Sequence, residues 1–497
     1  MKIKIFLIFV LVSVCNTLCG QLPTPNASLF LPGPPEDTSV EYLKDYSQYV
    51  WGKSMRNTSG WQNASTDINF QLSTYINAFS PLIGLEISNK NTPYIYKILD
   101  YIMTYGQITI ENANKSWFVL PPYERFNEKS LVPTYEEKYS DISSYPSSFA
   151  LMGWLTALTL IEICPDKQDD VLVRGFKFGT SSIIAGYNWD SDAISGRLLA
   201  CALSAYMHNH AYFNELLKYA RTEYEQKTGI NNTIITTDPN SPFFPNEDLP
   251  DAIKYLPEPP AIESVSFSYD LNQHIINSRK RSTSEGKTAV ADVDVSADYM
   301  VKIFSNAFGK TISRTETPHI YNLISRVHKT GSPAYNSAKQ KYMRTRPYVL
   351  LNEKTSYAPD EESGKTNGSY PSGHSSEGWL VAMVLAEINS DKTEDILARA
   401  YQYGQSRVIT GYHWQSDVDA GRLVASTVYA HLHACDEFMT MMEQAKKEFN
   451  GATSTRAVLD DNKSGGTTIY KLDGTRVEGT PSNTGIYIQG NKKIVIK

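Results

Sequence analysis

The sequence predicts an all-α protein of two tandem helical domains, followed by a small C-terminal β module. Three observations predict this fold class. One long segment occurs twice at a constant offset, apolar residues recur at helical spacing in both copies, and short β-rich runs appear only after residue 450. A chain of 497 residues is long enough for several domains of ordinary size.

The duplication is clearest where SYPSGHSSEGWLVAMVLAEI (residues 369–388) is compared with SYPSSFALMGWLTALTLIEI (residues 144–163). Aligning His374 with Phe149 sets an offset of 225 residues, the difference between 374 and 149. The same offset pairs LPEPP with LPGPP, NEK with NEK, and SRVITGYHWQSDVDAGRLVA with SSIIAGYNWDSDAISGRLLA. A repeat of this length is a whole domain and not a solenoid unit.

Both copies have the pattern of helical domains. The segments AEINSDKTEDILARAYQYGQSR and SDVDAGRLVASTVYAHLHA carry apolar or small residues three and four positions apart, and strand-like alternation is scarce before residue 450. We expect one helical domain at residues 21–227 and a second at residues 249–450. Residues 228–248, rich in Asn, Thr and Pro, are expected to connect them.

The two ends of the chain differ from the repeats. MKIKIFLIFVLVSVCNTLCGQ combines two lysines, an apolar run and small residues near Gly20, which is typical of a secretory signal peptide at residues 1–20. A buried N-terminal helix is the alternative. Residues 451–497 begin as a polar linker and continue with β-rich runs such as GIYIQG and KKIVIK. We therefore expect an exported protein with a small β-rich C-terminal module.

Composition argues against several classes of protein. The net charge is −6 and no long block of like charge occurs, so nothing indicates a nucleic-acid partner. No later apolar run reaches the roughly 20 residues that a transmembrane helix needs. Beyond the N-terminal segment the cysteines are Cys164, Cys201 and Cys435, too few for a disulfide framework. A Cys164–Cys201 bridge and inert buried thiols both remain open.

Cations and a helix start in the second copy predict an anion site. Lys339, Arg346 and Arg407 have no carboxylate partner in their motifs, and arginine forks match phosphate oxygens. Pro371 cannot lie inside a helix, so the apolar helix of this copy should begin just after it. The first-turn N–H groups, which follow the PSGH motif at residues 371–374, would then face an anion.

Histidines of the second copy supply the reactive groups. His413 and Asp417 are four positions apart, which predicts one face of a helix, with Asp417 fixing the tautomer of a nucleophilic imidazole. His374 is left as the proton donor to a leaving group. Taken singly, these motifs are explained as a structural pair, a solvated face or a helix cap. Together they predict a phosphoryl-transfer site without a metal.

The order K-x6-RP, PSGH and SR-x5-H-x3-D resembles the motif of the type 2 phosphatidic acid phosphatase superfamily, which includes vanadium haloperoxidases. NGSYPSGHSSEGW, GQSRVITGYHWQSDVDAGRLVAS and SEGKTAVADVDVSAD are similar to the class A bacterial non-specific acid phosphatases. The resemblance covers roughly residues 250–450 well, and residues 30–225 weakly through the duplication. Ser375 departs from a threonine that this family often has.

The resemblance implies a periplasmic or secreted acid phosphatase that acts on small phosphomonoesters without metal or cofactor. His413 would become a phosphohistidine with Asp417 orienting it, and His374 would protonate the leaving oxygen and later activate water. The residues implied in holding the phosphoryl oxygens are Lys339, Arg346, Ser372, Gly373 and Arg407.

The first copy has lost most of this set. Asn114, Pro121, Phe149, Ser182 and Asn188 stand at the positions of Lys339, Arg346, His374, Arg407 and His413, while Ser147, Ser181 and Asp192 remain. The residues that specify packing are kept, so we expect a folded but inactive domain. It is predicted to form an intramolecular pseudo-dimer with the second copy; the alternative is a binding module.

Two rival functions remain open. One is a vanadate-dependent haloperoxidase, which uses a similar oxyanion cage, and the other is a non-catalytic surface or binding protein. The tail from Tyr470 resembles C-terminal sorting modules of type IX-secreted bacterial proteins, which favours a location at the cell surface or outside the cell.

Overall fold

The structure, a computed structural model, describes residues 23–230 and 241–451, together with the backbone of four short strands nearer the C-terminus. We call residues 23–230 the N-terminal half and residues 241–451 the C-terminal half. The predicted signal peptide at residues 1–20 lies outside the described residues, as does the middle of the predicted connector, residues 231–240.

Each half is built from α-helices. The N-terminal half contains α2 (Val40–Met55), α3 (Ala64–Asp67), α4 (Leu72–Ile83), α5 (Pro93–Ala113), α6 (Pro122–Arg125), α7 (Glu136–Tyr139), α8 (Ser148–Ile163), α9 (Gln168–Ala185), α10 (Asp190–Met207) and α11 (Ala211–Thr228). The C-terminal half contains α12 (Ala252–Tyr255), α13 (Val265–Ser278), α14 (Ser284–Ala291), α15 (Ala297–Phe308), α16 (Pro318–Gly331), α17 (Asn336–Tyr342), α18 (Pro347–Leu350), α19 (Glu361–Lys365), α20 (Gly373–Ile388), α21 (Thr393–Thr410), α22 (Gln415–Leu432) and α23 (Asp436–Phe449). Short 3₁₀ turns are η1 (Ala27–Leu29), η2 (Ser59–Trp61), η3 (Pro133–Tyr135), η4 (Pro165–Lys167), η5 (Asn246–Asp248), η6 (Arg279–Ser282), η7 (Ala358–Asp360) and η8 (Ser390–Lys392).

Helix bounds in the two halves recur at the offset seen in the sequence. The helices α4, α9 and α10 have the same lengths as α15, α21 and α22, and each begins 225 positions earlier. Within the described residues up to 451 no strand is present, so the prediction of an all-α architecture is confirmed there. The two halves are therefore alike in these helices, whereas the position of α5 is taken by two helices, α16 and α17, in the C-terminal half.

Short strands lie in the part of the tail where the sequence predicts β-rich runs. They are β1 (Ile469–Lys471), β2 (Arg476–Val477), β3 (Gly485–Gln489) and β4 (Lys492–Ile496). They pair antiparallel in the order β2-β1-β3-β4, with Ile486 opposite Val495. The rest of residues 452–497 lies outside the described residues, and a separate sorting module stays a prediction.

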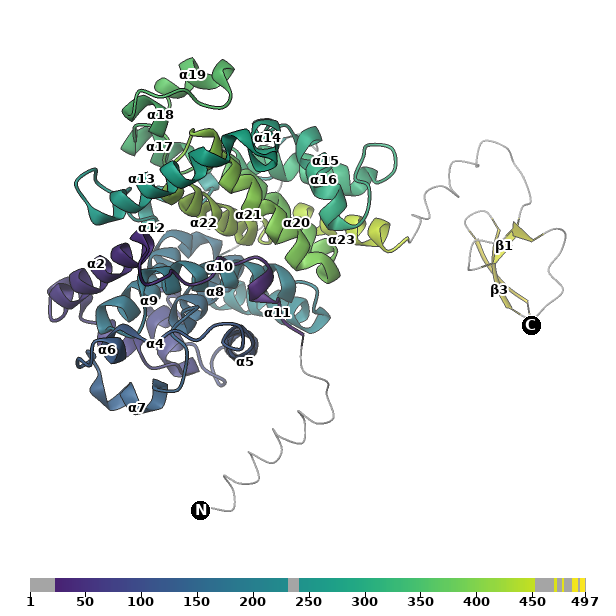
Figure 1. Ribbon diagram of the computed structural model, residues 1–497. Helices are drawn as coiled ribbons and strands as arrows, with labels where there is room; N and C mark the ends of the chain where they lie inside the picture. Colours follow the sequence, from purple (N-terminus) through teal and green to yellow (C-terminus); the bar gives the residue numbers. More distant parts are fainter. Residues whose placement is uncertain are drawn as a thin grey trace.

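The two halves stack through their central helices (Figure 1). Helices α8 and α10 lie against α20 and α22, and α2 lies against α13. The indole Nε1 of Trp154 on α8 donates to the hydroxyl of Ser426 on α22 at 3.1 Å. Each half also extends a short N-terminal arm over the other, because η1 contacts α21 and α12 contacts α9.

Burial in the core is deepest along two equivalent helices. All residues of α20 except His374 are buried, and all residues of α8 except Ser148 are buried. Part of the predicted connector is also core, since Phe243 and Phe244 are 0% and 1% exposed. The three cysteines of the described residues are free and buried, which leaves no Cys164–Cys201 bridge.

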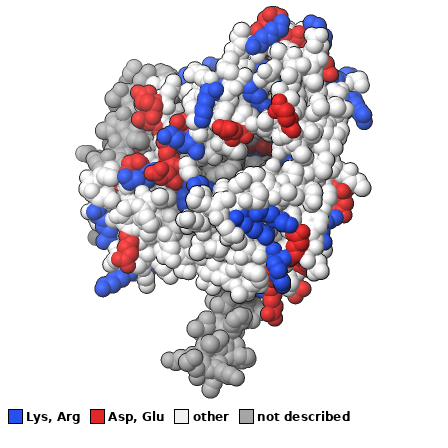
Figure 2. Space-filling view, turned by 90° about the vertical axis from the view of Figure 1, so that its left-hand side faces the viewer, with Lys and Arg blue, Asp and Glu red and all other residues white. Residues whose placement is uncertain are grey.

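Acidic and basic side chains are interspersed on the face drawn in Figure 2, without a broad patch of one sign. This face has no cluster of basic side chains that would attract a polyanion. Among the described residues, no helix combines the length and apolar character that crossing a bilayer demands.

Candidate active site

A cavity of about 310 Å³ in the C-terminal half gathers six of the eight residues that the sequence predicts for the site. These six are Lys339, Arg346, Gly373, His374, Arg407 and His413. The other two, Ser372 and Asp417, are fully buried and do not line the cavity. These six residues come from α17, the start of α18, the first turn of α20, the last turn of α21 and the turn before α22.

The start of α20 faces the cavity, as predicted. Ser372 is the N-cap residue, and its hydroxyl accepts the N–H of Ser375 at 3.3 Å, so this hydroxyl is used for capping. A Cβ at Gly373 would lie 2.6 Å from Cζ of Tyr335, so only glycine fits there. The N–H groups of Gly373 and His374 in this first turn have no partner within their own helix, which leaves them available to an anion.

His413 lies in a turn and not on a helix. Gly411, with φ of 88°, ends α21 in the left-handed region, and α22 begins only at Gln415. The prediction that His413 and Asp417 share a helix face is therefore wrong. The pair still meets, because Asp417 reaches back from the first turn of α22, where its Oδ2 accepts the N–H of Trp414 at 2.8 Å. This Oδ2 lies 3.4 Å from Nδ1 of His413.

An arginine that the sequence analysis missed holds Asp417 in place. Arg344 Nη1 donates to Asp417 Oδ1 at 2.6 Å, and Arg344 Nη2 donates to Asp270 Oδ2 at 2.7 Å. Although burial alone would raise the pKa of Asp417, Arg344 and His413 hold it well below its usual value. Arg344 lies inside the motif KQKYMRTRP, but nothing in the sequence connects it with a carboxylate as distant as Asp270.

Three cations line the cavity together with His413. Arg346 Nη1 lies 3.1 Å from His413 Nε2, and Lys339 Nζ donates to the carbonyl of Gly368 at 2.8 Å. Arg407 is 2% exposed, and its Nε and Nη1 have no hydrogen-bond partner among the described residues. A buried guanidinium with free N–H groups is costly unless an anion joins it, so these groups fit phosphoryl oxygens.

The crowded cations change the protonation of the site. Burial and then Arg346 lower the pKa of Lys339 to about 7. Burial is also the largest cause at both histidines, followed by Arg407 for His374 and by Arg346 for His413, and both pKa values fall well below the usual range. Neutral imidazole is the form that a nucleophile needs. An entering dianion would offset these cations and restore a proton to His374.

A wall of polar side chains completes the cavity, and the sequence analysis did not find it. Glu377 on α20 accepts the hydroxyl of Tyr335 at 2.6 Å and lies 3.0 Å from Nε2 of His328. His374 Nε2 lies 2.9 Å from the carbonyl oxygen of Val293 on another wall. None of these groups belongs to a recognisable short motif, and only the folded helices bring them together.

The corresponding place in the N-terminal half is filled by aromatic rings. Phe149 lies at the position of His374 and packs with Ile68, Tyr123, Ala185 and Tyr187 in a small buried cluster. At the position of His413, Asn188 accepts the hydroxyl of Ser147 at 2.8 Å and donates to the carbonyl of Ser144 at 2.7 Å. Neutral residues thus stand at the positions of all three cations and both histidines.

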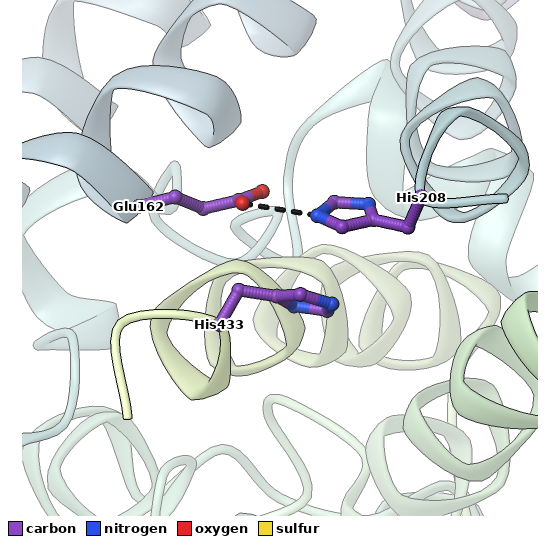
Figure 3. A group of neighbouring side chains, drawn as sticks. All are labelled: Glu162, His208 and His433. Carbon is purple, nitrogen blue, oxygen red and sulfur yellow. Dashed lines mark hydrogen bonds and ion pairs between the residues drawn. The ribbon is translucent and has the colours of Figure 1, made fainter. Parts of the chain in front are cut away.

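A second titratable cluster lies between the halves (Figure 3). His208 Nε2 lies 3.0 Å from Glu162, His433 Nε2 lies 2.9 Å from Glu387, and the two imidazole centroids are 3.8 Å apart. Donor atoms of Glu162, His208 and His433 lie within 4.8 Å of one another, a spacing that also suits a metal. Each imidazole already contacts a backbone carbonyl through Nδ1, which fits a buried ionic contact.

Protonation of this cluster follows from its partners. Although burial alone would lower the pKa of His208, Glu162 raises it. Burial would raise the pKa of Glu387, yet Lys446 and His433 hold it well below its usual value. The cluster is thus an ionic network that joins the halves.

Comparison with known proteins agrees with this site. The family model described as the PAP2 superfamily matches residues 324–439. The chain is 42% identical over 216 residues to a non-specific acid phosphatase of Providencia stuartii, a match that covers 43% of this chain and 87% of the relative. It is 38% identical over 223 residues to a non-specific acid phosphatase of Salmonella typhimurium, a match that covers 45% of this chain and 89% of the relative. An acid phosphatase of Zymomonas mobilis is 34% identical over 211 residues, and that match covers 42% of this chain and 80% of the relative. The chain therefore belongs to the PAP2 superfamily and is homologous to the bacterial non-specific acid phosphatases.

Proposed function

We propose that this protein is an acid phosphatase that hydrolyses phosphomonoesters through a phosphohistidine at His413. The observation that carries the proposal is the cationic cage of Lys339, Arg346 and Arg407, which line one cavity with His413, with Arg346 at Nε2 and with Nε and Nη1 of Arg407 unpaired among the described residues. The names of the homologous proteins, all phosphatases, support the same activity.

In the first step, Nε2 of His413 donates its lone pair to phosphorus. The Nδ1–H of His413 donates a hydrogen bond to Asp417 and keeps its proton, and Arg344 keeps Asp417 ionised. As the bond between phosphorus and the ester oxygen breaks, His374 transfers its proton to that oxygen and the alcohol leaves. The cage and the first-turn amides of α20 stabilise charge on the phosphoryl oxygens, which is commonly the largest contribution in such sites.

In the second step, His374 takes a proton from water while the water oxygen attacks phosphorus. The bond between phosphorus and His413 breaks, and inorganic phosphate is released. The proton that His374 gave up in the first step is thereby restored, so both histidines return to their starting forms. The chain's own cations neutralise charge throughout, and we expect a chelator to leave turnover unchanged.

Preference for acid pH follows from two groups. Lys339 is charged below its pKa of about 7 and loses this charge as pH rises through 7, which weakens binding of the phosphoryl oxygens. His374 must carry a proton to serve as an acid, and its lowered pKa makes that proton scarce at high pH. Both effects reduce activity on the alkaline side.

The N-terminal half is proposed to be a duplicated, inactive phosphatase domain at residues 21–227 that pairs with the catalytic domain at residues 249–450. Matching helix bounds at one offset, exchanged arms and the His208–His433 contact support this pseudo-dimer. Deletion of residues 21–245 tests it. Loss of folding supports a structural partner, whereas intact folding with altered substrate preference supports a binding module.

Export is part of the proposal. The N-terminal residues 1–20 have the pattern of a signal peptide, and residues 451–497 have that of a linker and a sorting-like module, which favours a periplasmic, secreted or surface location. Mass spectrometry of the protein recovered from outside the cytoplasm, with its termini sequenced, tests both segments.

Activity is tested with an aryl phosphate on the wild type, His413→Ala and Phe149→His. We expect full activity in the wild type, none in His413→Ala and no gain in Phe149→His. The similar oxyanion cage of vanadium haloperoxidases makes bromide oxidation by peroxide with added vanadate the second assay. Bromide oxidation without aryl phosphate hydrolysis would replace the phosphatase assignment by a haloperoxidase.

A further inference from the structure

A buried pair of aspartates in the N-terminal half has lost the arginine that its counterpart contains. In the C-terminal half, Arg344 lies between Asp270 and Asp417 and donates to both carboxylates, at 2.7 and 2.6 Å. Its guanidinium also lies over the ring of Trp414, 5.7 Å from the centroid. This arginine neutralises two carboxylates that are each 0% exposed.

The N-terminal half keeps both carboxylates in the same hydrogen bonds. Asp45 accepts the N–H and the hydroxyl of Ser191 at 2.8 and 2.6 Å, as Asp270 does from Ser416 at 2.9 and 2.6 Å. Asp192 Oδ2 accepts the N–H of Trp189 at 2.8 Å, which is the bond that Asp417 makes with Trp414. The two half-sites therefore have one geometry.

Valine stands where the arginine would be. The carbonyl of Val119 accepts the N–H of Ser144 at 2.9 Å, and the carbonyl of Arg344 accepts the N–H of Ser369 at the same distance. The backbone at the two positions therefore lies alike, and only the side chain differs. The N-terminal half therefore keeps both carboxylates, but its Val119 supplies no guanidinium to pair with them.

The space beside the two aspartates is a cavity of about 270 Å³. It is lined by Asp45, Val119, Trp189, Asp192 and other residues of the N-terminal half. Asp192 Oδ1, which corresponds to the oxygen that Arg344 binds in Asp417, is buried and has no hydrogen-bond partner among the described residues. A buried acceptor left in this state is costly, and it marks the place where a donor fits.

Charges around the pair do not substitute for the arginine. Lys44 faces Asp45 but is paired with Asp190 at 2.8 Å, and Asp190 itself adds negative charge. Arg125 lines the cavity and its guanidinium lies over the rings of Tyr42 and Trp189, but it pairs with Asp37 and not with either aspartate. Among the described residues, the side chains that donate to Asp192 are thus neutral ones, and no guanidinium bridges the two aspartates.

The pKa values of both aspartates reflect this deficit. Burial is the largest cause that raises the pKa of Asp45, with Asp190 next. Burial raises the pKa of Asp192 to about 7, although the Trp189 N–H, the nearby hydroxyl of Ser144 and the side chain of Asn188 each lower it. A cation placed between the aspartates would favour their ionised forms.

We propose that this cavity binds a small guanidinium or amidinium cation. One N–H edge of the planar cation donates to Asp192 Oδ1 and the other to Asp45 Oδ2. This arrangement repeats the contacts of Arg344 with Asp417 and Asp270. A planar fork matches two carboxylates better than a compact ammonium does.

Calorimetric titration of the full chain with methylguanidinium at pH 8 tests the site. We expect one saturable site in the wild type, with at least tenfold weaker binding of methylammonium and of Mg²⁺. Binding should weaken at pH 5, because Asp192 then takes up a proton. Absence of a saturable site in the wild type at pH 8 overturns the proposal, as does equal binding of methylammonium or of Mg²⁺.

Two variants tie the binding to this cavity. Val119→Arg supplies the missing guanidinium from the chain, so it should abolish methylguanidinium binding and raise the melting temperature. Asp192→Asn, which keeps an acceptor for the Trp189 N–H, should weaken binding at least tenfold. Unchanged binding in either variant places the ligand elsewhere and contradicts the proposal. If Val119→Arg does not fold, Asp192→Asn alone decides.

Aryl phosphate turnover is the control for fold integrity, because the cavity lies outside the candidate active site. Val119→Arg and Asp192→Asn should both keep wild-type turnover. Binding can fail while turnover persists, and turnover can fail while binding persists, so this proposal and the phosphatase proposal are tested separately. The ligand class, and not a particular metabolite, is what the experiment identifies.

Discussion

The two halves of the molecule share the bounds of their central helices at one offset and the capping bonds before α10 and α22, yet among the described residues the charged cavity at a central helix start is that of α20. At α20 the cavity is lined by three cations and by the imidazoles of His328, His374 and His413. At α8 the same place holds Phe149 and its aromatic neighbours. The difference shows that the helical frame does not need the site. Buried cations without an anion are costly, and where no anion has to be bound, apolar rings fill the space.

The largest expected effect separates the nucleophile from its counterpart. His413→Ala should reduce kcat for an aryl phosphate by about 10⁴-fold or more, since no other group of the cage can form the covalent intermediate. The matched variant Asn188→Ala, at the same position in the N-terminal half, should leave kcat unchanged. Residual turnover near the wild-type value in His413→Ala would show that the nucleophile has been misassigned.

The second largest effect is expected when Arg344 is replaced by valine, the residue at the matching position 119 of the N-terminal half. Arg344→Val leaves Asp270 and Asp417 buried without a cation, which should cost about 3–5 kcal/mol in the free energy of unfolding. Because Asp417 no longer holds His413, kcat should fall by roughly 10²-fold. Urea denaturation and steady-state kinetics measure the two effects.

Arg344→Lys serves as the conservative control for this positioning role. It should recover part of the stability and part of kcat, because lysine keeps the charge but not the fork. A loss of stability in Arg344→Val with kcat unchanged would mean that Arg344 supports the fold alone.

A smaller effect is expected from charge at Lys339. In the wild type this side chain loses its proton as pH rises through about 7, whereas Lys339→Arg stays charged. Between pH 6 and pH 8, inhibition by inorganic phosphate should weaken by up to about tenfold more in the wild type than in the variant. Comparing the two proteins removes the titration of phosphate itself. Parallel profiles would contradict a lowered lysine pKa.

The smallest effect concerns the aromatic cluster. Phe149→His puts an imidazole among apolar rings and should cost about 2 kcal/mol of stability, measured by urea denaturation. Placed in the His413→Ala background, it should restore no aryl phosphate hydrolysis, because the cations remain absent from the N-terminal half. Recovered turnover would show that the first copy needs less than the full cage.

Residues of the cage were accessible to sequence reasoning because each lies in a short motif. PSGH placed His374 at the start of α20, and the spacing to Arg346 and Arg407 identified the cations. Periodicity and the repeat also gave the helical class. These signals are local, and the structure adds distances that link them.

Other features depend on contacts between distant segments, which no spacing reveals. Asp270 reaches the site through Arg344 and Ser416, and Glu377 on α20 meets His328 and Tyr335 only after α16, α20 and the start of α17 have packed. The assumption of a helix across residues 413–417 failed because Gly411 turns the chain before α22 begins. Periodicity cannot separate a helix from the turn that precedes it.

Covalent trapping at His413 tests the central claim most directly. The protein is mixed with an aryl phosphate, quenched within one turnover under alkaline conditions that preserve phosphohistidine, and digested for mass spectrometry. We expect the peptide that contains residue 413 to gain one phosphoryl group on the imidazole, and His413→Ala to gain none. Turnover of the substrate with no phosphoryl group on this peptide at any time, or with the group on another residue, would contradict the account.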